Sequence, residues 1–219
     1  FGSFCSEEGF FFCIKIGMNI DPACGSGNFL TETYLSLRRL ENQVIRMLTY
    51  DQQVLGGMSD YPWIQDSIGQ FYGIEINDFA VTVAKTALWI AEAQMMEETE
   101  SIVHQNLDFL PLKSYANIVE GNALRIDWED VVSKEKLNYI MGNPPFVGFT
   151  YMSDTQKADM EYIFPKTKNL DFVAAWYKVA SDYIQNTPIE CGFVSTNSIT
   201  QGETVTSLWK YLNILINFA

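Results

Sequence analysis

The residues with the clearest capacity for chemistry form the sequence NPPF, which directly follows the apolar run YIMG: Asn143, Pro144, Pro145 and Phe146. The side-chain carbonyl of Asn143 and the backbone carbonyl of Pro144 are two acceptors that can converge on one NH₂ group. Phe146 adds a flat apolar face on which a planar ring can stack. These residue types therefore suit the capture of a nucleobase by its exocyclic amine. A strand-ending Asn-Pro turn, with Phe146 in the core, is the alternative.

A Gly-rich segment, DPACGSGNFL, follows an earlier apolar run and begins at Asp21. Gly25 and Gly27 permit a tight turn and let a ligand approach the backbone closely. Leu30 stands where the dinucleotide motif G-x-G-x-x-G needs its third glycine, which disfavours a pyrophosphate site and favours a cofactor without phosphates. An ordinary turn is the alternative, because short Gly-rich patterns are common.

Two more apolar runs end in polar residues. Glu75 ends FYGIE, where an acidic side chain can accept the hydroxyl protons of a ribose, and the neighbouring Ile76 can pack on a base. Asn122 follows ANIVEG, where its amide can bond an adenine edge. Taken alone, Glu75 is equally explained as a helix cap or surface charge, and Asn122 as a turn residue.

Alternating strands and helices would position these residues. The apolar runs predict strands within 11–20, 70–78, 116–124, 137–146 and 190–199. Helical spacing predicts helices over 29–48, 79–98, 170–184 and 203–216, with Asn77 or Asp78 capping the second, and 49–70 as an irregular connection. This alternation of strands and helices predicts an α/β fold with a doubly wound, mostly parallel sheet and no internal domain boundary. Ligands of such sheets bind beyond the carboxyl ends of the strands.

Composition excludes several classes of function. The formal charge is −13, from 14 Lys plus Arg against 27 Asp plus Glu, and no basic run marks a nucleic-acid surface. The 4 cysteines form no CxxC pair and there is 1 histidine, so we expect no metal site and a reduced, cytoplasmic chain. No segment predicts a membrane span or an export signal.

The motifs DPACGSGNFL, GIEIND, GNAL and NPPF, in this order, resemble those of the S-adenosyl-L-methionine-dependent DNA adenine-N6 methyltransferases. NFLTETYLSLRRLE, FAVTVAKTALWIAEAQM and FVSTNSITQGE are similar in particular to the MmeI-like enzymes of type II restriction-modification. The resemblance implies a Rossmann-like class I methyltransferase fold over 1–219, incomplete at the C-terminal end. It also implies a catalytic domain without the family's target-recognition domain or its usual N-terminal cofactor motif.

The resemblance also implies the roles of individual residues. Asn143, Pro144, Pro145 and Phe146 would be catalytic, holding the amine of an adenine flipped out of double-stranded DNA. S-adenosyl-L-methionine would be bound by residues that follow three strands: Asp21, Pro22, Ala23, Gly25, Gly27, Asn28, Phe29, Glu75, Ile76, Asn122 and Ala123. Neither a metal nor a membrane would be involved. The alternatives are a catalytically idle cofactor-binding or scaffold fragment, and an RNA or protein amine methyltransferase.

Overall fold

The computed structural model describes residues 17–51, 64–104, 116–165 and 169–199, with a few positions between 205 and 212. The apolar residues before Gly17 and most of the predicted helix 203–216 lie outside the described residues. Within the described part, no helix is long and apolar enough to cross a membrane.

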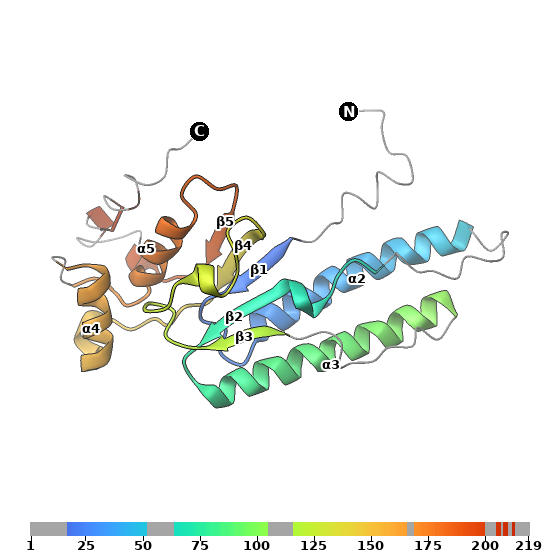
Figure 1. Ribbon diagram of the computed structural model, residues 1–219, viewed down its shortest axis with the longest axis horizontal. Helices are drawn as coiled ribbons and strands as arrows, with labels where there is room; N and C mark the ends of the chain where they lie inside the picture. The colour runs from blue at the N-terminus through green and yellow to red at the C-terminus, as the bar shows by residue number, and fades with distance from the viewer. Residues whose placement is uncertain are drawn as a thin grey trace.

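The centre of the fold is a five-stranded parallel sheet in the order β3-β2-β1-β4-β5 (Figure 1). The strands are Met18–Asp21 (β1), Phe71–Glu75 (β2), Asn117–Glu120 (β3), Leu137–Gly142 (β4) and Glu190–Phe193 (β5). β1 pairs with β2 on one side and with β4 on the other, and every pair is parallel. The chain crosses from β3 past the centre to β4, so strand order reverses between β1 and β4. The predicted doubly wound α/β fold is confirmed.

Helices cover both faces of this sheet, and each face has its own apolar core. α2 (Asn28–Asp51) and α3 (Asp78–Val103) bury Leu30, Leu88 and their neighbours against Phe71 and Ile118. On the opposite face, α5 (Ala174–Tyr183) and the short helix Trp128–Asp130 pack against strand residues that include Ile140. Apolar residues that alternate between the faces are typical of strands buried on both sides.

Local sequence explains where several elements begin and end. The Oδ1 atom of Asn77 accepts the Ala80 N–H at 3.0 Å, so the N-cap of α3 is Asn77 rather than Asp78. The strands are shorter than the apolar runs predicted: the fifth ends at Phe193, and Asn197–Ile199 forms a 3₁₀ turn. α4 (Asp154–Ile163) was not predicted, although Ser153 and Gln156 form the capping box that begins it.

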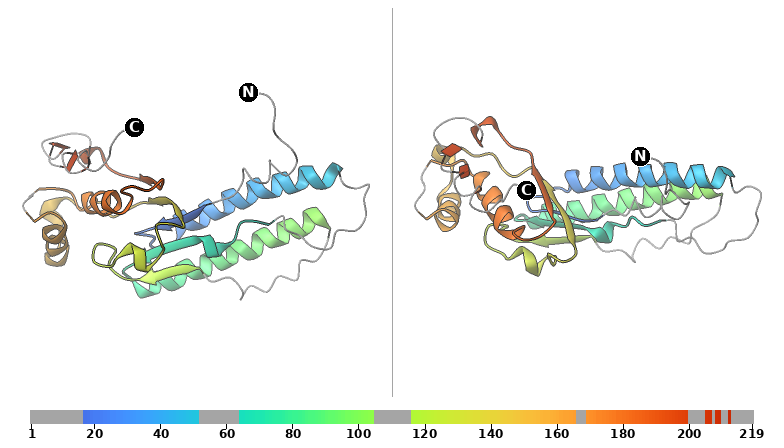
Figure 2. Two further views of the ribbon diagram at one scale, coloured as in Figure 1. Left: turned by 45° about the horizontal axis from the view of Figure 1, so that its top comes forward. Right: turned by 90° about the horizontal axis from the view of Figure 1, so that it is seen from above.

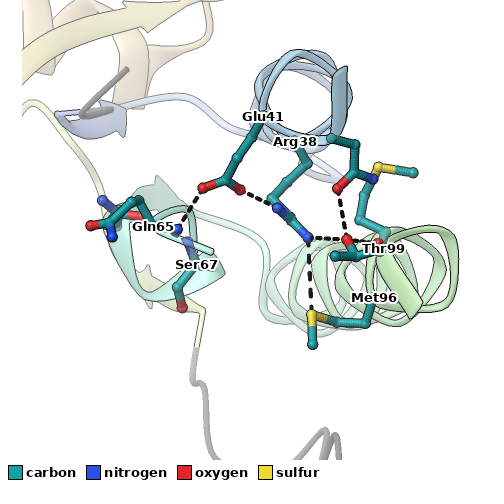
Figure 3. A network of polar contacts seen from close by, with 9 residues as sticks. Arg38, Glu41, Gln65, Ser67, Met96 and Thr99 are labelled. Atoms are coloured by element: carbon teal, nitrogen blue, oxygen red, sulfur yellow. Dashed lines mark hydrogen bonds and ion pairs between the residues drawn. The ribbon is translucent and has the colours of Figure 1, made fainter. Parts of the chain in front are cut away.

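α2 and α3 are much longer than the strands and extend side by side beyond the sheet (Figure 2). A buried polar network joins them there (Figure 3). The guanidinium of Arg38 pairs with Glu41 on its own helix and donates to the Thr99 hydroxyl of α3 at 2.8 Å. Glu41 in turn accepts the backbone N–H of Gln65, ahead of β2. The network fixes the two helices and the approach to β2 relative to one another.

Candidate functional site

Asp21 ends β1 as a buried carboxyl, with 1% of its surface exposed. Burial raises its pKa to about 7; the hydrogen bond from the Ala23 N–H, at 2.9 Å, opposes that rise and the charge of Glu75 adds to it. Gly142, the last residue of β4, makes room for it, because a Cβ there would lie 2.4 Å from Asp21 Oδ1. The ends of the two central strands are thus shaped around one acidic side chain.

The loop after β1 is folded tightly through its two glycines. Gly25 and Gly27 have φ values of +54° and +82°, in the left-handed region that favours glycine. A Cβ on Gly27 would lie 2.9 Å from the Cβ of Ala84 in α3, whereas nothing lies within 4 Å of one built on Gly25. Gly27 therefore allows the loop to touch α3, and Gly25 leaves open space above the backbone.

Glu75, at the end of β2, braces this loop. Its Oε2 atom accepts the Gly25 N–H at 3.0 Å, and its Oε1 atom accepts the N–H of Asn77 at 2.9 Å. Glu75 thus joins the Gly loop to the start of α3, while the cap of that helix is Asn77 and not Glu75. Ile76 beside it is 68% exposed and free to cover a planar ligand.

Asn122, after β3, is held at both ends of its amide. Its Oδ1 atom accepts the Leu124 N–H at 2.9 Å, and its Nδ2 atom donates to Oδ2 of Asp159 on α4, also at 2.9 Å. The bond from the Leu124 N–H is the one expected of a turn residue, so Asn122 does have the turn role that the sequence left open. The bond to α4 connects this loop to a helix that the sequence prediction missed.

The NPPF segment leaves β4 in an anchored loop. Pro144 is buried, whereas Phe146 is not in the core, since 43% of its surface is exposed. The carbonyl of Val147 accepts the Phe172 N–H at 2.9 Å, which joins the segment to the approach to α5. An anchored loop with an exposed ring is suited to stacking.

The ends of β1, β2, β3 and β4 open onto one pocket of about 940 Å³. It brings together eight of the predicted site residues: Pro22, Ala23, Glu75, Ile76, Asn122, Ala123, Asn143 and Pro145. Seven others do not line it: Asp21, Gly25, Gly27, Asn28, Phe29, Pro144 and Phe146. Of these, Asp21 lies buried at the end of β1, while Phe29 is exposed on the first turn of α2.

The far wall of this pocket was not predicted from the sequence. α4 and its cap contribute Ser153, Thr155, Gln156, Ala158 and Asp159, and the start of α5 contributes Phe172 and Trp176. The Nε1–H of Trp176 donates to the carbonyl of Pro22 at 3.0 Å, across 154 residues of sequence. The capping box before α4 is readable in the sequence, but nothing local predicts the Trp176 contact.

The charges around the pocket indicate which ligands fit. Two carboxyls, Asp21 and Glu75, flank the Gly loop. The one basic side chain in the described lining, Arg125, is already paired, with its Nε–H donating to Asp159 Oδ1 at 2.6 Å. The site suits ribose hydroxyls and a cationic group better than phosphates. The residues present therefore fit S-adenosylmethionine.

Two further features of the described residues concern a buried thiol and candidate metal ligands. Burial raises the pKa of the Cys24 thiol above its usual range, and the charges of Asp21 and Glu75 add to that rise, so the thiol stays protonated and is a poor nucleophile. Among the described residues, no group of three or more His, Cys, Asp or Glu side chains is placed to hold a metal ion.

The sequence matches the family described as "MmeI, DNA-methyltransferase domain" over residues 14–219. It is 45% identical over 208 residues to DNA methyltransferase A of Bacillus subtilis (strain 168), which covers 91% of this chain and 23% of that protein. It is also 27% identical over 129 residues to a putative type II restriction enzyme and methyltransferase of Methanocaldococcus jannaschii, covering 57% of this chain and 10% of that protein.

Two solved structures of restriction-modification enzymes have a similar fold. The type IIL restriction-modification enzyme MmeI in complex with DNA superposes with a TM-score of 0.86 at 45% identity, covering 95% of this chain and 28% of that one. The ATP-dependent type ISP restriction-modification enzyme LlaBIII, bound to DNA, has a TM-score of 0.50 at 17% identity, a likeness of fold alone. This chain thus spans about a quarter of the length of its 45%-identical relatives.

Proposed function

Because the chain belongs to the family of MmeI DNA-methyltransferase domains, we propose that it methylates the exocyclic N6 amine of adenine in DNA, with S-adenosylmethionine as methyl donor. One observation carries the proposal: the segment DPACGSG and the segment NPPF follow the two adjacent strands between which strand order reverses. This is where open parallel sheets bind their ligands.

The cofactor half of the site is assigned to the ends of β1, β2 and β3. Asp21 and the loop from Gly25 to Gly27 hold the methionine part, Glu75 accepts the ribose hydroxyls, and Asn122 binds the adenine edge. When bound, S-adenosylmethionine supplies an electrophilic methyl group on its sulfonium. For Glu75 to reach a ribose, its bonds to the Gly25 and Asn77 N–H groups must be shared or exchanged, which is feasible because a carboxylate accepts several hydrogen bonds at once.

The catalytic half is assigned to the end of β4. An adenine amine is a weak nucleophile, because its lone pair is delocalised into the ring. The side-chain carbonyl of Asn143 and the backbone carbonyl of Pro144 accept its two N–H groups, which favours a more tetrahedral nitrogen with a directed lone pair. Phe146 stacks on the base after it has flipped out of the duplex. The residues act by positioning the reacting nitrogen in a pocket shielded from water.

DNA is the proposed substrate of the protein as a whole. A net charge of −13 leaves this chain with little capacity to neutralise phosphates. We therefore assign most of the DNA-gripping surface, and the choice of recognition sequence, to parts of the protein beyond these 219 residues. In this proposal the chain is the catalytic domain of a restriction-modification or phage-defence enzyme that acts in the cytoplasm.

The test separates binding from transfer. In the intact protein, Asn143→Ala should reduce transfer of a labelled methyl group to double-stranded DNA by at least about a hundredfold. Cofactor affinity, measured by calorimetry, should change by less than about threefold, because Asn143 contacts the amine and not the cofactor. Gln43→Ala, which removes an exposed amide from α2, is the control and should leave both unchanged. Transfer at the normal rate by Asn143→Ala would contradict the role of Asn143.

A further inference from the structure

α4 forms a wall of the pocket that no motif accounts for. Among the residues that α4 and its cap contribute to the described lining, Asp159 is the one with a carboxyl group. Only 8% of Asp159 is exposed. Its two oxygens have different partners: Oδ1 accepts the Nε–H of Arg125 at 2.6 Å, and Oδ2 accepts from Nδ2 of Asn122 at 2.9 Å. In Figure 1, α4 stands beyond the strand ends, apart from the sheet that carries the motifs.

Arg125 holds Asp159 in this position. Besides its ion pair, Arg125 donates from Nη2 to the carbonyl of Ala158 at 2.9 Å, and its Cζ atom lies 4.3 Å from the ring centre of Tyr162. Three contacts thus attach Arg125, from the loop after β3, to α4. The carboxylate is left with one oxygen directed at Asn122.

This arrangement allows only one orientation of the Asn122 amide. A carboxylate accepts hydrogen bonds and cannot donate them, so Asp159 must face the NH₂ group. The Leu124 N–H, at the other end, must face the carbonyl. A rotation of the amide by 180° would point its carbonyl at the carboxylate and its NH₂ group at an N–H. The amide of Asn122 is therefore fixed by both partners.

The fixed amide still has hydrogen-bonding capacity for a ligand. Of the two protons on Nδ2 one is used, and of the two lone pairs on Oδ1 one is used, so one donor and one acceptor remain. An adenine edge offers the complement, a donating amine beside an accepting ring nitrogen. A 6-oxopurine places a carbonyl where adenine has its amine, and the fixed amide would meet it with the wrong partner.

We propose that Asp159 is a positioning residue that makes the pocket selective for an adenine base over a 6-oxopurine, by fixing the orientation of the Asn122 amide. The inference rests on the proposed function, since it takes the ligand of this pocket to be the adenosyl group of the cofactor. It goes beyond that function, because it assigns the discrimination between purines to a residue outside the motifs.

The test compares two ligands in the intact protein: S-adenosylhomocysteine and S-inosylhomocysteine, its 6-oxo analogue, both titrated by calorimetry. Asp159→Asn keeps the shape of the side chain, but the Nε–H of Arg125 would hold its carbonyl, so its NH₂ group would face Asn122 and oppose the amide orientation that the Leu124 N–H requires. We expect the preference for the adenosyl ligand to fall at least about tenfold, the size of one hydrogen-bond mismatch in a buried site. Asp159→Ala should lower the preference in the same direction.

Glu161→Gln removes the same charge from an exposed position of α4 and should leave the preference unchanged. A purely structural role for Asp159 predicts a different result, namely equal weakening of both ligands with the ratio preserved, and that result would overturn the inference while leaving the proposed function intact. Failure of the unchanged protein to bind S-adenosylhomocysteine would contradict the proposed function itself and this inference with it. Because each variant is its own reference for the ratio, partial loss of stability does not obscure the outcome.

Discussion

Asp21 shows how the fold surrounds a single acidic side chain at the end of a strand. Its carboxyl is removed from water at the end of β1, Gly142 leaves room for it, and Glu75 contributes a second negative charge nearby. In the protein without ligand, these surroundings favour the protonated form. A cationic group bound at the Gly loop would have the opposite effect and favour the carboxylate.

Cofactor affinity should therefore rise with pH. Below its pKa of about 7 Asp21 binds a proton, which a cationic ligand must displace. We expect affinity to increase between pH 6 and pH 8, with a limiting slope of about tenfold per pH unit on the acid side. Calorimetry over this range measures it. In the Asp21→Asn variant, the affinity should change with pH only because the ligand itself titrates. The difference between the two affinity curves therefore measures the contribution of Asp21. Parallel curves would contradict a role for this carboxyl.

The motif residues were predictable from sequence to different extents. Glu75 and Asn143 were placed correctly at strand ends because a polar residue that closes an apolar run is a local signal. The partners of those residues were not predictable. The bond from Asn122 to Asp159 joins the loop after β3 to α4, 37 residues apart, and the position of Phe146 outside the core depends on how Val147 is anchored. Such contacts depend on tertiary packing, which local patterns do not encode.

At the scale of elements, α2 and α3 combine predictable helices with an unpredictable interface. Apolar spacing identified both helices, but the same pattern would place Arg38 on a surface, and the structure buries it completely. Asp66, ahead of β2, is also buried, and neither of its carboxylate oxygens has a hydrogen-bond partner among the described residues. Burial raises its pKa to about 7; Glu41 contributes to the rise and Arg38 opposes it.

This buried carboxyl should make the protein less stable as pH rises. Folded Asp66 keeps its proton up to about pH 7, whereas an unfolded Asp loses it near its ordinary pKa of 3.8. The folded state therefore binds the extra proton between these values, and the free energy of unfolding falls as pH rises through them. Asp66→Asn has no such proton to lose. Its melting temperature, relative to the unchanged protein, should rise by several degrees between pH 5 and pH 8, because about two pH units of this range lie below the folded pKa of Asp66.

The comparison has internal controls. Asp21 also makes the free energy of unfolding fall as pH rises, because its pKa is raised in the same way. Since Asp21 is present in both proteins, its contribution cancels in the difference between them. Asp130→Asn, an exposed change in the short helix Trp128–Asp130, should leave the melting temperature unchanged at both pH values. A difference between Asp66→Asn and the unchanged protein that stays constant from pH 5 to pH 8 would show that Asp66 does not titrate as described.

At the scale of the molecule, the order of the strands explains why residues so far apart in sequence share one pocket. Parallel strands place all of their carboxyl ends at one edge, and the crossing from β3 to β4 places NPPF beside the Gly loop. The alternation of strands and helices predicted the parallel, doubly wound sheet but not the order of its strands. It did not predict α4, whose ten residues have a weak apolar stripe and close the pocket from beyond the edge of the sheet.

In this proposal, methyl transfer and contact with the DNA backbone are carried out by different parts of the protein. The chain supplies the methyl-transfer pocket, while its acidity leaves contact with the DNA backbone mainly to other parts. Its relatives of 45% identity are about four times as long, which is consistent with that division. The identity of the methylated base therefore tests what this pocket does, whatever sequence the remainder selects.

The most direct test is to identify that base. The intact protein would be incubated with double-stranded DNA and S-adenosylmethionine carrying a trideuterated methyl group, and the digested nucleosides analysed by mass spectrometry. We predict labelled N6-methyladenine, lost when Asn143 is replaced by Ala. Label on a cytosine instead, at its amine or at its ring carbon, would contradict the assignment of the NPPF segment, as would the absence of any labelled base from a protein that binds the cofactor.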